Sequence, residues 1–211
     1  MKCIYTAPKI VKKMFPHFVW ATTNNEILLT FDDGPNLGTT EVILKQLSKT
    51  NTKALFFCVG ENVVKYRSLV DEIISEGHLI GNHTFSHQKI WGLSEKQLTD
   101  NLLKFNSLLE NKHGQKVKYF RPPHGQFDFT LSKVLKKLNM QNVMWNLLTR
   151  DYKNDYNIVK FGVTKYLSAN SIIVLHDSNK SKQIISESIN LIYETAEKNM
   201  FKIGVPNKCL K

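Results

Sequence analysis

The chain has 211 residues, of which 42% are hydrophobic and 22% are charged, so it can bury a substantial core. Its formal net charge of +11 favours anionic partners. The lysines are scattered and form no basic stripe with interleaved aromatic residues, so nucleic-acid binding is not expected. The cysteines, Cys3, Cys58 and Cys209, lack the CxxC spacing of a zinc finger, and Cys58 is expected to be a buried small hydrophobe.

The sequence contains no stretch of about 18 apolar residues, so a transmembrane helix is not expected. Residues 1–20 carry lysines but no uninterrupted apolar segment of the kind found in signal peptides. No apolar leader precedes Cys3, which argues against a lipoprotein anchor. As written, the chain is expected to be cytoplasmic, and an envelope or extracellular location stays open. We expect one domain over residues 1–211, because no repeat or linker interrupts the chain, and we expect a monomer.

Short apolar runs alternate with longer helical patterns along the chain. The first half predicts a strand at 27–31, a helix at 40–47, a strand at 54–59, a helix at 63–74 and a strand at 79–82. Ser94 and Gln97 then form a capping-box pattern, and the helix that follows ends at Gly114. The second half predicts a strand at 118–121, a helix at 131–138, a strand at 143–146, a helix at 158–167, a strand at 171–175, a helix at 184–196 and a strand at 201–205.

This alternation predicts an α/β fold with a parallel sheet. The chain is shorter than the ~250 residues usual for an eightfold barrel. We therefore expect a distorted (β/α) barrel of about seven parallel strands, with a doubly wound open sheet as the alternative.

Polar residues able to carry chemistry follow one predicted strand after another. They are Asp32 and Asp33 after the first strand, His83 and His87 after the third, Arg121 and His124 after the fourth, Asp151 after the fifth, and His176 and Asp177 after the sixth. The carboxyl edge of a parallel sheet is where active sites are built. The pattern therefore predicts one shared site.

Two of these segments have the composition of a metal site. Asp32 and Asp33 are adjacent carboxylates, so one can bind a metal ion while the other acts as a base. His83 and His87 are four residues apart, and on a helical turn they would share one face. Two histidines and one carboxylate match the three protein ligands of a catalytic zinc site. Read alone, each segment is also compatible with a solvated turn or with unrelated histidines.

Two further segments suit acyl transfer. Residues 121–125, Arg-Pro-Pro-His-Gly, have a rigid backbone that can aim an N–H group at a developing oxyanion. His176 ends an apolar strand and could protonate a leaving amine. An ordinary proline turn and a lone strand-end histidine are the simpler alternatives.

Taken together and in this order, these segments resemble the polysaccharide deacetylases with a NodB-homology domain, carbohydrate esterase family 4. The resemblance covers residues 27–177. Residues 30–35, Thr-Phe-Asp-Asp-Gly-Pro, match the first motif in full, residues 83–87 match His-[Ser/Thr]-x-x-His, and residues 173–176 match the Leu-x-His type of closing motif. The resemblance implies a distorted (β/α) barrel.

The same resemblance implies an enzyme class and a cofactor. The enzyme would be a hydrolase of linear, non-peptide carbon–nitrogen amide bonds. It would remove acetyl groups from N-acetylglucosamine units of peptidoglycan, a chitin-type polymer or poly-N-acetylglucosamine. Asp33, His83 and His87 would hold one divalent metal ion, with Zn²⁺ expected and Co²⁺, Mn²⁺, Ni²⁺ or Fe²⁺ as alternatives. Asp32 would be the general base that activates water.

The remaining roles are also implied by the resemblance. Arg121 would orient Asp32, and the backbone N–H of His124 would stabilise the oxyanion. His176 would be the general acid, tuned by Asp151.

Three positions depart from the family pattern. His124 stands where the family usually has tyrosine, which affects side-chain contacts with substrate but not a main-chain N–H. Leu148 and Tyr152 replace the first Asp and the Trp of the Asp-x-x-Asp-Trp motif, and Tyr152 still offers an aromatic wall. The alternatives are an O-acetyl esterase acting on acetylated xylan and a non-catalytic sugar- or metal-binding relative. The second is disfavoured because the base and all three ligands are present.

Overall fold

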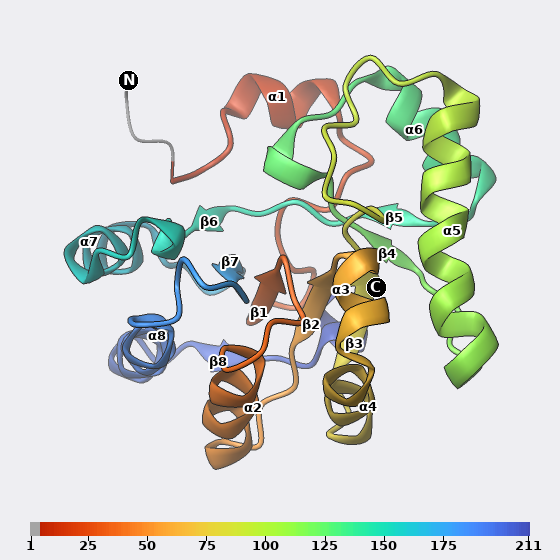
Figure 1. The fold of residues 1–211 in the computed structure, drawn as a ribbon. Helices are drawn as coiled ribbons and strands as arrows, with labels where there is room; N and C mark the ends of the chain where they lie inside the picture. Colours follow the sequence, from red (N-terminus) through yellow and green to blue (C-terminus); the bar gives the residue numbers. More distant parts are fainter. Residues whose placement is uncertain (1–4) are drawn as a thin grey trace.

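The computed structural model describes residues 5–211, and Cys3 lies outside this range. Within it, eight strands form one sheet whose pairs are all parallel. The order is β5-β4-β3-β2-β1-β7-β6, with β8 beside β1 (Figure 1). The strands are β1 (Glu26–Asp32), β2 (Leu55–Cys58), β3 (Leu79–Asn82), β4 (Tyr119–Phe120), β5 (Gln141–Asn142), β6 (Leu147–Leu148), β7 (Ile172–His176) and β8 (Lys202–Ile203).

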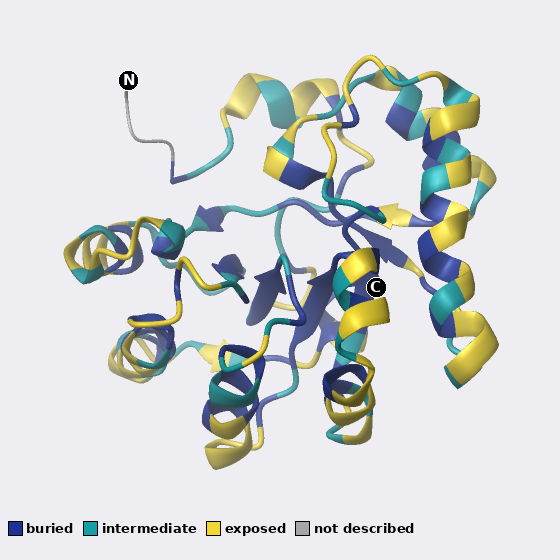
Figure 2. Cartoon of the chain, in the orientation of Figure 1, coloured by how far each residue is buried: buried dark blue, intermediate teal, exposed yellow. Residues whose placement is uncertain are grey.

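The centre of the sheet is the centre of the core. Residues 27–31 of β1 are completely buried, as are all four residues of β2. Strands covered on both faces need continuous apolar runs, which explains why these segments do not alternate with polar residues. Figure 2 shows the buried strands inside a ring of helices whose outer faces are exposed. Cys58 is completely buried, as expected.

Helices connect and cover the strands. They are α1 (Lys9–Met14), α2 (Thr40–Lys49), α3 (Gly60–Lys65), α4 (Arg67–Ser75), α5 (Glu95–His113), α6 (Phe129–Lys137), α7 (Tyr156–Tyr166), α8 (Ile185–Lys198) and α9 (Pro206–Cys209), with short 3₁₀ turns at Pro123–Gly125 and Asp151–Lys153. The capping box of Ser94 and Gln97 begins α5, and Gly114, in the left-handed conformation, ends it. No helix among residues 5–211 has the length and apolar character needed to cross a bilayer.

The sheet curls without closing. Its end strands, β5 and β6, each pair with a single neighbour among the described strands. At the opening, Val19 forms a parallel bridge with Val143. The expected distorted barrel of about seven parallel strands is confirmed, with β8 as a short addition.

Two element predictions were wrong. The helix expected at 63–74 is two helices, because Tyr66 leaves the helical region (φ −119°, ψ 55°) while apolar spacing continues on both sides. The strand expected at 143–146 is irregular. The carbonyls of Val143 and Met144 accept hydrogen bonds from the Arg121 side chain, at 2.8 and 2.9 Å, instead of pairing as a strand. Helices α1 and α9 were not foreseen.

The pairing register aligns the carboxyl ends of the central strands. Asp32 pairs with His176 on one side and with Phe57 on the other. Asn82, at the end of β3, pairs with Cys58 and Phe120. The carboxyl ends of the central strands therefore meet at one edge.

Candidate active site

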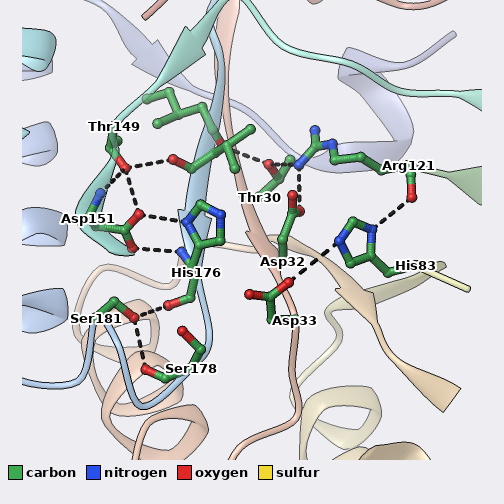
Figure 3. Close-up of polar contacts among 12 residues, drawn as sticks. Thr30, Asp32, Asp33, His83, Arg121, Thr149, Asp151, His176, Ser178 and Ser181 are labelled. Atoms are coloured by element: carbon green, nitrogen blue, oxygen red, sulfur yellow. Dashed lines mark hydrogen bonds and ion pairs between the residues drawn. The ribbon is translucent and has the colours of Figure 1, made fainter. Parts of the chain in front are cut away.

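A pocket of about 350 Å³ opens at this edge of the sheet. Eight residues singled out in the sequence line it, namely Asp32, Asp33, His83, His87, His124, Leu148, Tyr152 and His176. Two more, Arg121 and Asp151, are completely buried and bond to pocket residues from behind. Five separate segments of the chain thus contribute to one site, and Figure 3 shows its polar contacts.

Asp33, His83 and His87 converge on one point. Their candidate ligand atoms lie within 4.8 Å of one another. Asp33 Oδ1 is 3.1 Å from His87 Nε2 and 3.5 Å from His83 Nε2. One carboxylate oxygen and two imidazole nitrogens are a donor set that zinc and similar ions accept. The cluster is compatible with a divalent metal ion.

The two histidines do not share a helical turn, so that expectation was wrong. The chain after β3 is irregular, and Thr84 and His87 have φ values of 68° and 53°. The Asn82 side chain anchors this loop by accepting the Thr84 N–H (2.8 Å) and donating to the Leu102 carbonyl on α5 (3.1 Å). The histidines meet because the loop folds back, which i, i+4 spacing did not reveal.

Hydrogen bonds orient the candidate ligands. His83 Nδ1–H donates to the Arg121 carbonyl at 2.7 Å, which leaves Nε2 facing Asp33 (Figure 3). Metal-binding histidines are commonly fixed through their second nitrogen in this way. Burial alone would favour the neutral carboxyl of Asp33, but the neighbouring imidazoles of His83 and His87 outweigh it and lower the pKa of Asp33.

Asp32 has a separate, buried partner. Arg121 Nη1 donates to Asp32 Oδ1 at 2.7 Å and to Thr30 Oγ1 at 2.6 Å. The guanidinium also stacks over the Phe57 ring, 4.2 Å from its centroid. With its other donors on main-chain carbonyls, Arg121 is held rigidly. It can therefore fix the Asp32 carboxylate against the pocket wall.

His176 and Asp151 form the second buried pair. His176 Nδ1–H donates to Asp151 Oδ1 at 2.7 Å, and the His176 backbone N–H donates to Oδ2 at 2.7 Å. Thr149 Oγ1 donates to Oδ1 at 3.0 Å. Burial would lower the pKa of His176, but the charge and hydrogen bond of Asp151 raise it to about 9. The Tyr152 ring stands edge-on to the imidazole, with centroids 4.9 Å apart.

His124 lies at the pocket rim in an unusual backbone conformation. Its φ is 58°, while Gly125 and Gln126 donate their N–H groups back to Pro122 and Pro123. Its ring packs edge-on against His87, with centroids 4.7 Å apart. Within residues 5–211, no hydrogen bond engages the His124 N–H. That donor is free to bind an oxygen atom in the pocket.

Some residues contribute to the site although the sequence indicated no role for them. Thr30 bridges Arg121 to the Ile173 carbonyl, accepting from one and donating to the other. Asp177 is completely buried beneath the turn that follows β1 and accepts a hydrogen bond from Thr40 Oγ1 at 2.6 Å. Burial raises the pKa of Asp177 to about 8. The sequence placed Asp177 at a strand end, which was the available signal.

Trp145 and Lys180 also line the pocket. Trp145 lies in the segment mistaken for a strand, and Lys180 lies in the loop after β7. Nothing in their local sequence marks them, because their position depends on how the loops at the edge of the sheet approach one another.

Comparison with known proteins places this geometry in context. A family model described as polysaccharide deacetylase matches residues 21–143. A peptidoglycan-N-acetylglucosamine deacetylase of Bacillus cereus is 39% identical over 128 residues, which are 61% of this chain and 46% of that protein. The chain spans less than half the length of the first curated relatives that it matches.

Solved structures share the fold over nearly the whole chain. A peptidoglycan N-acetylglucosamine deacetylase in complex with 4-naphthalen-1-yl-N-oxidanyl-benzamide has a TM-score of 0.86 at 27% identity, over 96% of each chain. A mutant of a CE4 family pseudoenzyme with restored enzymatic activity has a TM-score of 0.83 at 26% identity, over 93% of this chain and 72% of that one. Because the fold is common to both, the residues of the site must indicate whether this chain is catalytic.

Proposed function

The chain belongs to the polysaccharide deacetylase family, and we propose that it is a metal-dependent hydrolase that removes acetyl groups from N-acetylglucosamine units of a glycan. The observation that carries this proposal is the meeting in one pocket of the Asp33–His83–His87 cluster, a second carboxylate and a further histidine. Peptidoglycan is the first candidate substrate, because the similar Bacillus cereus protein is named for it. Chitin-type oligomers and poly-N-acetylglucosamine are the other candidates.

The metal site would use Asp33, His83 and His87, whose donor atoms suit Zn²⁺ or a related ion. When bound, such an ion polarises the acetyl carbonyl and lowers the pKa of water. The hydrogen bond from His83 to Arg121 orients one ligand in advance. The chain thereby holds the ligand side chains ready on the pocket wall.

Asp32 would be the general base. Its carboxylate lines the pocket beside Asp33, and the ion pair with Arg121 keeps it in place. As water attacks the acetyl carbon, Asp32 accepts a proton. The free N–H of His124 donates to the oxygen that gains negative charge.

His176 would be the general acid. With a pKa of about 9 it carries a proton at neutral pH, and Asp151 holds Nδ1 so that Nε2 is the atom that donates. The proton passes to the departing sugar nitrogen, the carbon–nitrogen bond breaks, and acetate and a free amine are the products.

Acetate release tests the proposal directly. N-acetylglucosamine oligomers, peptidoglycan and acetylated xylan are compared with and without a chelator, and zinc is then added back. We expect release from the N-acetylated glycans that stops on chelation and returns with zinc. Undiminished turnover after complete metal removal would exclude the metal role. Release from xylan alone would make the protein an esterase.

A further inference from the structure

One face of the protein exposes large apolar side chains beside lysines. The apolar side chains, with their exposed fractions, are Ile10 (69%) and Met14 (53%) on α1, Trp91 (73%) before α5 and Phe129 (61%) at the start of α6. Side chains of this kind gain stability when they leave water, and a patch of them on a protein surface commonly marks an interaction site. We call these four residues the apolar face.

The four residues come from three segments of the chain but lie together. Met14 and Trp91 line an aromatic groove of about 460 Å³ between α1 and residues 125–127. Ile10 is one helical turn before Met14, so both project from the same side of α1. Phe129 stacks on the ring of Phe15, which directly follows Met14, with centroids 5.0 Å apart. Figure 1 shows α1 at the rim of the molecule, next to the segment that leads into α6.

Lysines border the apolar face. Lys9 and Lys13 occupy the neighbouring stripe of α1, and Lys89 lies two residues before Trp91. All three lysines are exposed, and none of them forms an ion pair within residues 5–211. The nearby carboxylate of Asp128 is engaged in capping α6. The border therefore carries positive charge that the described part of the chain does not neutralise.

We propose that the apolar face and its lysines dock on the surface of an anionic phospholipid membrane. The positive border complements lipid phosphates, and the apolar side chains of the rim helix enter the headgroup layer. Trp91 suits that layer because its ring is apolar and its N–H is polar. Docking holds the catalytic pocket, which shares Gly125 and Trp145 with the aromatic groove, beside the membrane. The inference does not depend on the proposed function, because docking needs no turnover.

Co-sedimentation with vesicles tests the docking. The protein is mixed at low salt with vesicles of phosphatidylglycerol and phosphatidylcholine in equal amounts, and separately with vesicles of phosphatidylcholine alone. We expect binding to the anionic vesicles that weakens as salt is added, and much weaker binding to the neutral vesicles. Absence of binding to the anionic vesicles, or equal binding to both kinds, would overturn the proposal.

Two double variants with the same net charge show where the membrane binds. Lys9→Gln combined with Lys13→Gln should lower the affinity for anionic vesicles about 30-fold, at about fivefold for each lysine. Lys45→Gln combined with Lys198→Gln removes the same charge from α2 and α8, which lie away from α1 (Figure 1), and should have little effect. Equal losses in the two proteins would show that net charge alone attracts the vesicles, which contradicts docking through this face.

A pair of apolar variants distinguishes a membrane from a soluble polyanion. Ile10→Ser combined with Met14→Ser should weaken vesicle binding at least about tenfold, whereas Met200→Ser, at an exposed apolar position after α8, should not. All three side chains are exposed, so the variants should fold, and circular dichroism checks this. Soluble polyphosphate can use the lysines but not the apolar face. Unchanged vesicle binding by the Ile10 and Met14 variant, or wild-type binding to polyphosphate as tight as to vesicles, would overturn the membrane assignment.

Discussion

Asp32 and Asp33 are consecutive in the chain but have different surroundings. Asp33 has a φ of 78°, which turns its carboxylate toward His83 and His87, whereas Asp32 ends β1 and pairs with Arg121. Adjacent residues thereby have different partners. The backbone, rather than the side-chain chemistry, separates a candidate ligand from a candidate base.

Asp32→Asn tests this separation. The amide keeps the shape of the carboxylate and can still accept from Arg121, but it is a poor base. We expect metal content near that of the wild type and turnover about 10²–10⁴-fold lower. Elemental analysis and acetate release measure the two effects, with His83→Ala as the variant that should lose the metal. The opposite outcome, metal lost in Asp32→Asn and kept in His83→Ala, would refute these roles.

His124→Tyr tests whether the main chain or the side chain acts at this position. The left-handed backbone and the flanking prolines position the N–H whichever ring is attached. We expect turnover to stay within about tenfold, equivalent to roughly 1.4 kcal/mol of barrier. A loss nearer 10²–10⁴-fold, or a change in metal content, would instead indicate a proton carrier or a fourth ligand. Steady-state kinetics and metal analysis distinguish the two outcomes.

The His176–Asp151 pair predicts a pH profile. His176 must be protonated to act as an acid, and its pKa is raised to about 9, so kcat should fall as pH rises through about 9. Asp151→Asn removes the negative charge that favours the imidazolium, and the alkaline limb should move to lower pH. A limb that stays in place in this variant would show that another group sets it.

At the scale of elements, the turn after β1 is packed directly on buried Asp177. A Cβ atom added at Gly34 would collide with the Asp177 carboxyl, so only glycine lets this turn approach. Because Gly34 follows Asp33, any shift there also moves a candidate ligand. The turn thus couples packing to the candidate metal site.

Gly34→Ala should therefore affect both stability and metal binding. We expect unfolding free energy to fall by about 1–3 kcal/mol, as for other overpacked sites, with reduced metal content in the folded fraction. Gly92→Ala is the control. It introduces strain at a φ of 82°, but nothing lies within 4 Å of the new Cβ. It should lose some stability and no metal. Normal metal content in Gly34→Ala would contradict the coupling.

At the scale of the whole molecule, the candidate ligands come from loops after β1 and β3 and meet only in the folded chain. An ion that binds only the folded state stabilises it by about 2.7 kcal/mol at a hundred times its Kd. For a domain of this size that corresponds to a rise in Tm of roughly 5–10 °C.

Thermal unfolding in the presence of zinc measures this coupling without any enzyme assay. The rise in Tm should be present in the wild type and in Asp32→Asn, and it should be absent from His83→Ala and His87→Ala. A full response in both histidine variants would place the metal elsewhere.

Much of the fold could be predicted from the sequence, because its patterns are local. Continuous apolar runs mark strands buried on both faces, and helical spacing and the Ser94–Gln97 capping box mark the helices. Parallel strands align their carboxyl ends, so polar residues placed after them were expected to share one edge. Their chemistry, in motif order, was enough to predict the family and the candidate ligands.

Tertiary contacts decided the rest. Residues 143–146 have a strand composition, but the carbonyls of Val143 and Met144 bond Arg121, which lies more than 20 residues earlier in the chain. His83 and His87 meet through a loop held by Asn82 against α5, not through helical periodicity. The aromatic groove exists only because α1 packs beside residues 125–127. Each of these features depends on partners that are distant in sequence. A local pattern does not indicate which distant segment supplies those partners.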